Sequence, residues 1–150
     1  MFRIALVLLL LLGLGAATAA RADGEIGLGV TDEIDGTNTE AAMVSWLSEQ
    51  RYPWEVSIGH LEERDEDTLA PSPSTTFVAV GRRINWRNWF LSTGIALVDC
   101  DNDILSGHGQ FITGLGWRGK SLTVNVRHLS NASTTGRNRG ETFLLVGYAW

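Results

Sequence analysis

The sequence predicts an all-β protein, an eight-stranded antiparallel transmembrane β-barrel that follows an N-terminal signal peptide. Three observations predict it. Apolar residues alternate with small or polar ones, long polar links alternate with short ones, and the weaker strand faces carry glycine and serine instead of charge. An even number of antiparallel strands can close into a barrel, which leaves no unpaired edge.

Residues 1–22 are interpreted as a cleaved signal peptide, and residues 23–150 as a single outer-membrane barrel domain. Arg3 gives a short basic start, and residues 4–14 form an apolar run that is too short for a membrane-spanning helix, which needs about 20 residues. Ala20-Arg21-Ala22 is a small-x-small cleavage site, so we expect cleavage before Asp23, with Ala19 and Ala20 as the nearby competitors.

The composition argues against a nucleic-acid partner, an internal disulfide and a metal site. The chain has 17 acidic against 12 basic residues, whereas a nucleic-acid-binding protein needs a basic face. Cys100 is the only cysteine, so no internal disulfide is expected, and no cysteine and histidine cluster predicts a metal site.

Eight segments of the chain show the period of two that is typical of half-buried strands. They are residues 26–30, 42–47, 54–58, 75–82, 89–97, 111–117, 122–130 and 142–150. The links 31–40, 62–74, 99–107 and 131–140 are long and polar, whereas 48–51, 83–88 and 118–120 are short. Long outer loops that alternate with short inner turns are typical of outer-membrane barrels.

The strand faces predict which side chains point outward. Charges in mid-strand are nearly limited to Glu55 and Arg127, and the lumen of an eight-stranded barrel is just wide enough for its own side chains. We therefore expect the large apolar residues to face lipid and seven glycines to face the lumen: Gly27, Gly29, Gly59, Gly94, Gly114, Gly116 and Gly147. Four tryptophans near the turn ends predict an aromatic girdle at the inner interface: Trp46, Trp54, Trp89 and Trp117.

The segment His128-Leu129-Ser130-Asn131-Ala132 carries the candidate chemistry. His128 and Ser130 lie two residues apart at the outer end of the seventh expected strand, so both share the lipid-facing side with Leu122, Val124 and Val126. Their separation of about 6.5 Å along the strand lets an imidazole reach a hydroxyl. An imidazole that activates a hydroxyl is the arrangement for nucleophilic ester cleavage.

Residues 127–150 resemble the C-terminal signature of the PagL-type lipid A 3-O-deacylases, which are outer-membrane barrels that hydrolyse one acyl ester of lipopolysaccharide. The matching parts are His128-x-Ser130-Asn131-Ala132, Asn138-x-Gly140-Glu141 and the closing aromatic strand that ends at Trp150. The chain departs from the family at Ser133, where glycine is usual, and at residues 137–139, where a proline-rich loop is usual.

The resemblance implies a serine esterase with Ser130 as nucleophile, His128 as base and Glu141 as the acid that orients the imidazole. It implies that lipid A in lipopolysaccharide is the substrate, that the enzyme lies in the bacterial outer membrane with its active site facing the outer leaflet, and that it needs no cofactor. It leaves a homodimer open. Asn131, by its side chain or backbone N–H, and the backbone near Gly140 are candidate donors to the oxyanion.

Strand parity complicates the assignment of Glu141. Counting back by twos from Trp150 places Thr142 on the lipid face and Glu141 on the lumen side, away from His128. A β-bulge near Gly140, or a loop position for Glu141, would bring its carboxylate to the imidazole. On either route we expect Glu141→Ala to lower kcat strongly.

Two other classes of function stay open at this point. One is a non-catalytic small outer-membrane barrel with a structural or loop-binding role, and the other is a soluble periplasmic lipid carrier whose apolar face points inward. His60 and His108 are interpreted as ordinary residues near the outer loops. The acidic segment 62–67 is interpreted as a solvated loop in preference to a site for divalent cations.

Overall fold

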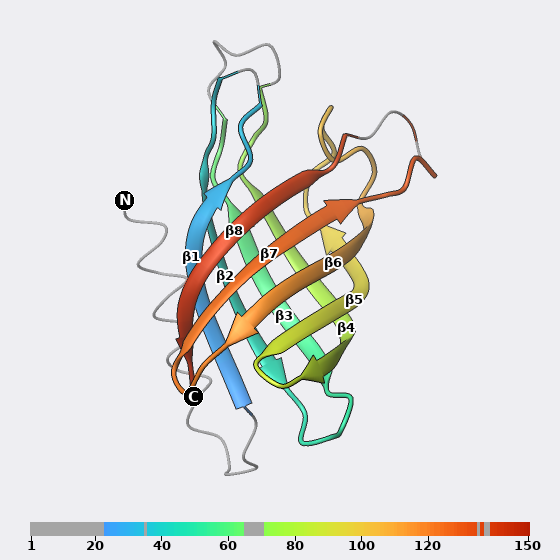
Figure 1. Cartoon of the computed structure of the whole chain (residues 1–150). Helices are drawn as coiled ribbons and strands as arrows, with labels where there is room; N and C mark the ends of the chain where they lie inside the picture. The colour runs from blue at the N-terminus through green and yellow to red at the C-terminus, as the bar shows by residue number, and fades with distance from the viewer. Residues whose placement is uncertain (1–22, 35, 65–70, 135, 137–138) are drawn as a thin grey trace.

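The computed structural model describes residues 23–34, 36–64, 71–134, 136 and 139–150, and the expected signal peptide lies outside them. Its strands are β1 (Asp23–Thr31), β2 (Glu40–Leu47), β3 (Trp54–Leu61), β4 (Thr75–Trp86), β5 (Trp89–Val98), β6 (Gly109–Arg118), β7 (Leu122–Ser130) and β8 (Glu141–Ala149). Each strand pairs antiparallel with the next, and β8 pairs with β1, so that the sheet closes (Figure 1). The expected eight-stranded antiparallel barrel is confirmed. Among the described residues, no helix is long and apolar enough to cross a membrane.

The two faces of the barrel wall carry the expected side chains. The large apolar residues point outward, as Leu28 at 63% exposure and Leu97 at 62% illustrate. Glycines line the lumen where bulky side chains cross it. A Cβ at Gly59 would lie 2.2 Å from the Phe77 ring. The larger apolar side chains of the strands therefore point outward, the reverse of a carrier whose apolar strand face points inward.

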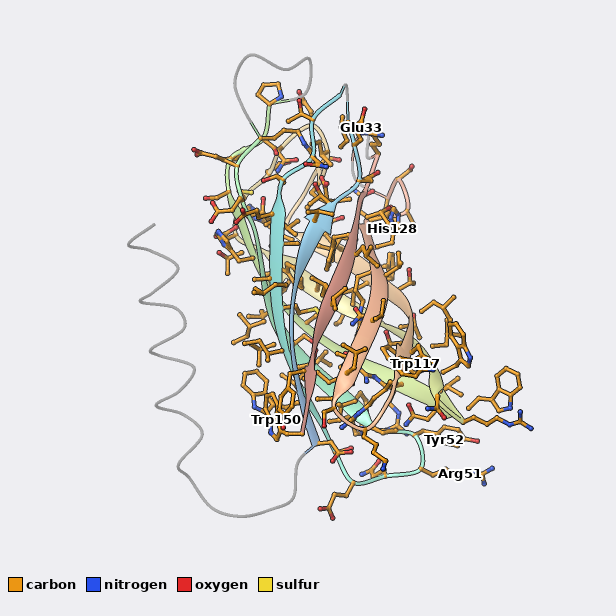
Figure 2. The ribbon with its side chains drawn as sticks, turned by 60° about the vertical axis from the view of Figure 1, so that its left-hand side comes forward. Glu33, Arg51, Tyr52, Trp117, His128 and Trp150 are labelled. Carbon is orange, nitrogen blue, oxygen red and sulfur yellow. The ribbon has the colours of Figure 1, made fainter. Side chains whose placement is uncertain are left out.

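The apolar outer face is continuous with aromatic residues at the turn end of the barrel. Trp54 and Trp89 are about half exposed there, and the Arg82 guanidinium lies 4.6 Å from the centroid of the Trp54 ring. Figure 2 shows Tyr52, Trp117 and Trp150 at this end and His128 toward the other. An apolar band with aromatic residues at its edge is typical of barrels that stand in lipid.

A buried cluster of ion pairs lies in the lumen near the turn end. Arg83 donates to both carboxylate oxygens of Glu25, at 2.6 and 2.9 Å, and to Glu55 at 2.7 Å. Arg127 donates to the same Glu55 oxygen at 2.6 Å. Each charge is thus paired inside the barrel, which a buried charge requires.

The placement of Arg83 in a short link was wrong. β4 continues to Trp86, so the connection to β5 shrinks to Arg87 and Asn88, and Arg87 adopts a positive φ of 55°. Arg83 is 1% exposed in the lumen because Glu25 and Glu55 both offer carboxylates to its side chain. The backbone pairing of β4 with β5 continues to Trp86 and Trp89, beyond the residue where the alternation of apolar residues stops.

A second buried ion pair lies in the lumen at the loop end. Arg64, which we expected in a solvated loop, is 2% exposed and its NH2 donates to Glu141 at 2.8 Å and to Thr31 at 2.9 Å. The backbone of Arg64 also forms a bridge with Ser72. The link between β3 and β4 therefore places a cation inside the barrel, paired with Glu141, the residue before Thr142.

Candidate active site

The register between β7 and β8 determines what the His128 ring contacts. His128 and Thr142 are directly opposed residues of the two strands, and both side chains lie on the outer face. The Nδ1 atom of His128 lies 2.9 Å from the Thr142 hydroxyl. Since Nδ1 is engaged by Thr142, Nε2 is the ring nitrogen left for a reaction with Ser130.

Ser130 is the last residue of β7 and lies on the same face as His128. Figure 2 shows His128 near the loop end of the barrel, far from the aromatic residues of the turn end. The hydroxyl of Ser130 accepts a hydrogen bond of 3.2 Å from the backbone N–H of Ala132. The chain thus folds back over the candidate nucleophile immediately after the strand ends.

This fold-back is a tight turn with two residues in the left-handed region. Ala132 and Ser133 have φ angles of 53° and 60°, which cost energy for residues that carry a Cβ. The backbone N–H of Ser133 donates to the Asn131 side-chain oxygen at 2.7 Å, and the Thr134 hydroxyl donates to the Asn131 carbonyl at 2.7 Å. Asn131 therefore stabilises the turn that follows Ser130.

The Asn131 side chain is occupied elsewhere in this structure, and the role of Asn131 as a donor to the oxyanion stays a prediction. Asn131 is fully buried, and its amide nitrogen donates to the Ser106 carbonyl at 2.6 Å. The physical reason is parity, because the residue after an outward-facing Ser130 points inward. The backbone of Asn131 is not excluded from that role by this contact.

Gly140 lies against the His128 ring. Its N–H donates to the Ile104 carbonyl at 3.0 Å, so the expected role of its backbone as donor to the reaction is not supported. Its φ is +78°, and a Cβ at this position would lie 2.6 Å from Cε1 of the His128 ring. Gly140 is instead the residue that lets the loop backbone approach the imidazole.

The structure places the Glu141 carboxylate in the lumen and not at His128, and its role as the orienting acid stays a prediction. Glu141 pairs with Leu129 in a regular register, so no bulge turns it outward, and it is 4% exposed. Its carboxylate accepts hydrogen bonds from Arg64 at 2.8 and 3.3 Å. Glu141 therefore lies on the lumen side, as its position in the strand predicts, and the buried Arg64 pairs with its carboxylate there.

Two residues at this site were not recognised from the sequence. Thr142 takes the position beside Nδ1 that we expected for a carboxylate, and its N–H donates to the Asp32 carboxylate at 3.2 Å. The N–H of Asp32 donates in return to the Thr142 carbonyl at 2.7 Å. The outward parity of Thr142 was the only sequence signal for it, and nothing in the local pattern connects it with Asp32.

Within the part of the chain that the structure describes, no group of three or more histidine, cysteine or acidic residues could hold a metal ion. His60 and His108 lie elsewhere. The Nδ1 atom of His60 lies 3.0 Å from the Thr76 hydroxyl, and that of His108 lies 3.0 Å from the Val98 carbonyl.

Comparison with known proteins bears on the family and on the fold. The family model described as "Lipid A 3-O-deacylase (PagL)" matches residues 24–150. The solved structure titled "Crystal structure of the outer membrane enzyme PagL" superposes with a TM-score of 0.62 at 16% sequence identity, covering 85% of this chain and 98% of that one. Comparison with curated protein sequences finds no significant match.

Proposed function

Because the chain belongs to the lipid A 3-O-deacylase (PagL) family, we propose that it is a serine esterase that hydrolyses the 3-O-linked hydroxyacyl ester of lipid A. The observation that carries the proposal is the pairing of His128 with Thr142 on the outer face of the barrel, with Ser130 on the same face. A polar pair on a lipid-facing surface is costly unless it has partners. It is also where an enzyme that attacks lipid esters needs its reactive groups.

The reaction follows from the roles of these two side chains. Nε2 of His128 takes the hydroxyl proton as Ser130 Oγ forms a bond to the ester carbonyl carbon, which gives a tetrahedral oxyanion. The carbon–oxygen bond to the sugar then breaks, and the leaving sugar oxygen receives the proton from His128. A water molecule, deprotonated by the same nitrogen, then attacks the carbonyl carbon of the acyl-serine. The bond from this carbon to Ser130 Oγ breaks, Oγ takes the proton back from His128, and the 3-hydroxy fatty acid is released.

We assign the positioning of His128 to Thr142 in place of Glu141. A hydrogen bond donated by Nδ1–H of His128 to the Thr142 hydroxyl would hold the ring orientation and leave the Nε2 lone pair available to accept the proton of Ser130, which is the role of the third member of a catalytic triad. A hydroxyl performs this orientation without the charge that a carboxylate would contribute. The family resemblance assigns this role to Glu141, and the two assignments differ in their mutational outcome.

Backbone amides of the turn after Ser130 are the proposed donors to the oxyanion. The N–H of Ala132 lies 3.2 Å from Ser130 Oγ, close to where the carbonyl oxygen of the substrate would develop charge. The N–H of Asn131 is adjacent in the same turn. The hydrogen bonds of Asn131 hold Ala132 and Ser133 in left-handed conformations, which supports a preorganised site.

We further propose that the barrel stands in the bacterial outer membrane with its loop end toward the outer leaflet. The outward apolar face and the aromatic turn end support membrane insertion. The orientation follows if both termini are periplasmic, because the reactive end of β7 then lies near the outer headgroups. Such a barrel should need detergent for extraction and should migrate differently on a gel before and after boiling.

Expression in a bacterium whose lipid A retains its 3-O-acyl chain tests the proposed activity. Mass spectrometry of lipid A should show the loss of one 3-hydroxyacyl chain upon expression of the wild-type protein, and no loss with Ser130→Ala. Unchanged lipid A, in cells that contain the folded wild-type barrel in the outer membrane, would favour a structural role for the protein instead.

A further inference from the structure

A second set of residues, far from His128 in sequence, repeats the contacts of the candidate active site. We call His128, Thr142 and Asp32 the β7–β8 triplet, and His60, Thr76 and Asp99 the β3–β4 triplet. In the β3–β4 triplet Nδ1 of His60 lies 3.0 Å from the Thr76 hydroxyl, against 2.9 Å in the β7–β8 triplet. His60 and Thr76 are directly opposed across their strands, as His128 and Thr142 are.

The aspartates of the two triplets also make the same bonds. The N–H of Thr76 donates to the Asp99 carboxylate at 2.8 Å, and the N–H of Asp99 donates to the Thr76 carbonyl at 3.0 Å. The corresponding distances for Thr142 and Asp32 are 3.2 and 2.7 Å. Asp99 directly follows β5 and Asp32 directly follows β1, so each aspartate lies just after the strand that adjoins its threonine.

Both triplets lie at the same height on the barrel. His60 is the seventh residue of β3, counted from Trp54, and His128 is the seventh residue of β7, counted from Leu122. β3 and β7 run in the same direction and are four strands apart in a closed barrel of eight, so they lie on opposite walls (Figure 1). In a membrane the two histidines would therefore face the same leaflet from opposite sides.

The triplets differ at the position where the nucleophile stands. The residue two positions after His60 is Glu62, whereas the residue two positions after His128 is Ser130. Nε2 of His60 lies 3.8 Å from the Glu62 carboxylate, and about a third of each side chain is exposed. A carboxylate offers this imidazole no hydroxyl to deprotonate, so the β3–β4 triplet lacks the group that would attack an ester.

We infer that the β3–β4 triplet is a second copy of the catalytic arrangement, which meets acyl esters of outer-leaflet lipids and is inactive only because residue 62 is a glutamate. This inference rests on the proposed function of the β7–β8 triplet. A hydroxyl at position 62 would give its proton to Nε2 of His60 and bond to the ester carbonyl carbon. The bond to the lipid's alcohol oxygen would break, this oxygen would take the proton, and water would then hydrolyse the acyl-enzyme.

The test is transfer of activity from one wall to the other. The double variant Ser130→Ala with Glu62→Ser is compared with Ser130→Ala with Glu62→Ala, each purified as a folded barrel that shifts on a gel upon heating. We expect the first to release 3-hydroxy fatty acid from lipid A, and the second to release none above background. The rate should lie about 10²- to 10³-fold below wild type, because the copy lacks the turn of Asn131 and Ala132, and lost oxyanion donors cost roughly that much.

Adding His60→Ala to the active double variant should remove the transferred activity, which separates a catalytic arrangement from an exposed serine. If the wild type is active and Ser130→Ala is not, yet the folded double variant releases no more fatty acid than its Glu62→Ala control, the inference is overturned and the proposed function stands. Activity that remains in Ser130→Ala alone would contradict the proposed function itself.

A cysteine variant tests the same inference if the serine variant does not assemble into a barrel. In a Cys100→Ala, Ser130→Ala background, Glu62→Cys places a thiol beside His60, and its alkylation rate is measured with and without His60→Ala. Faster alkylation with His60 present shows that the imidazole activates the residue at position 62. Equal rates would overturn the inference.

Discussion

The β7–β8 triplet and the β3–β4 triplet have the same backbone register and the same histidine, threonine and aspartate contacts. They differ in the residue two positions after the histidine, which is Ser130 on the serine wall, around β7 and β8, and Glu62 on the glutamate wall, around β3 and β4. The serine wall also has Gly140 against its imidazole, whereas Ser74 precedes Thr76 by the same two positions on the glutamate wall. The comparison teaches that the strand pairing, with the aspartate that follows the adjoining strand, produces a histidine whose Nδ1 contacts a threonine on the outer face of the barrel. If the proposed function holds, activity then requires a residue that the imidazole can deprotonate, and the turn after that residue raises the rate.

The strongest contrast is expected at the two positions that differ. Ser130→Ala should lower kcat by about 10⁴-fold or more, because loss of the nucleophile removes the covalent pathway. Glu62→Ala, its counterpart on the other wall, should leave kcat unchanged. Release of 3-hydroxy fatty acid from lipid A, followed by mass spectrometry, measures both, and substantial turnover by Ser130→Ala would remove the serine-esterase assignment.

The two histidines should differ almost as strongly. His128→Ala should lower kcat by about 10³-fold, within the range that general acid–base catalysis contributes. His60→Ala and His108→Ala should retain most activity in the wild-type background. Since the nucleophile and base act as a unit, the double variant of Ser130 and His128 should be scarcely worse than Ser130→Ala alone, and additive losses would argue against a shared role.

Gly140 tests how closely the loop must approach the His128 ring. Gly140→Ala would place a Cβ 2.6 Å from Cε1 of the ring, and displacement of a catalytic group by about 1 Å can cost roughly 10²-fold in rate. Gly36→Ala is the matched control, because Gly36 also has a positive φ, of 84°, but has nothing within 4 Å of the added methyl. Equal effects of the two substitutions on kcat would assign the loss to backbone strain alone.

A smaller effect is expected for the threonines that hold the two rings. Thr142→Val removes one hydrogen bond to Nδ1, worth about 1 kcal/mol, and should lower kcat about fivefold to tenfold while leaving KM nearly unchanged. Thr142→Ser should restore the rate. Thr76→Val makes the same change in the β3–β4 triplet and should have no effect on wild-type kcat.

The smallest effect on catalysis is expected at Glu141. Its carboxylate pairs with Arg64 in the lumen, so Glu141→Gln should leave kcat nearly unchanged and lower the free energy of unfolding by about 1–3 kcal/mol. Denaturant titration of the barrel, read by the gel shift upon heating, measures the stability. A strong loss of kcat with unchanged stability would return the role of orienting acid to Glu141.

The fold could be predicted from the sequence because its signals are local. Alternation along each strand separates residues that face lipid from those that face the lumen, and glycines such as Gly59 and Gly116 occur where large side chains must cross a narrow interior. The same parity placed His128, Ser130 and Thr142 together on the outer face. None of these inferences needs to know which strand residue lies opposite which.

The ion pairs could not be predicted in this way. Arg83 and Glu25 are 58 positions apart, and Arg64 and Glu141 are 77 apart, so their partners are decided across the lumen. Alternation indicates that a side chain points inward but not what it meets there. For this reason Arg83 was placed in a turn, Arg64 in a solvated loop and Glu141 at the imidazole.

The sequence by itself determined that the chain forms a closed eight-stranded barrel and that an imidazole and a hydroxyl stand together on its outer face. Only the tertiary structure decided that Thr142 holds Nδ1, that Glu141 serves Arg64, and that His60 repeats the arrangement of His128 on the opposite wall. The physical reason is that the side of the sheet to which a side chain points depends only on the position of its residue along the strand. The neighbour of that residue depends on the register between strands, which packing and pairing across the closed barrel establish.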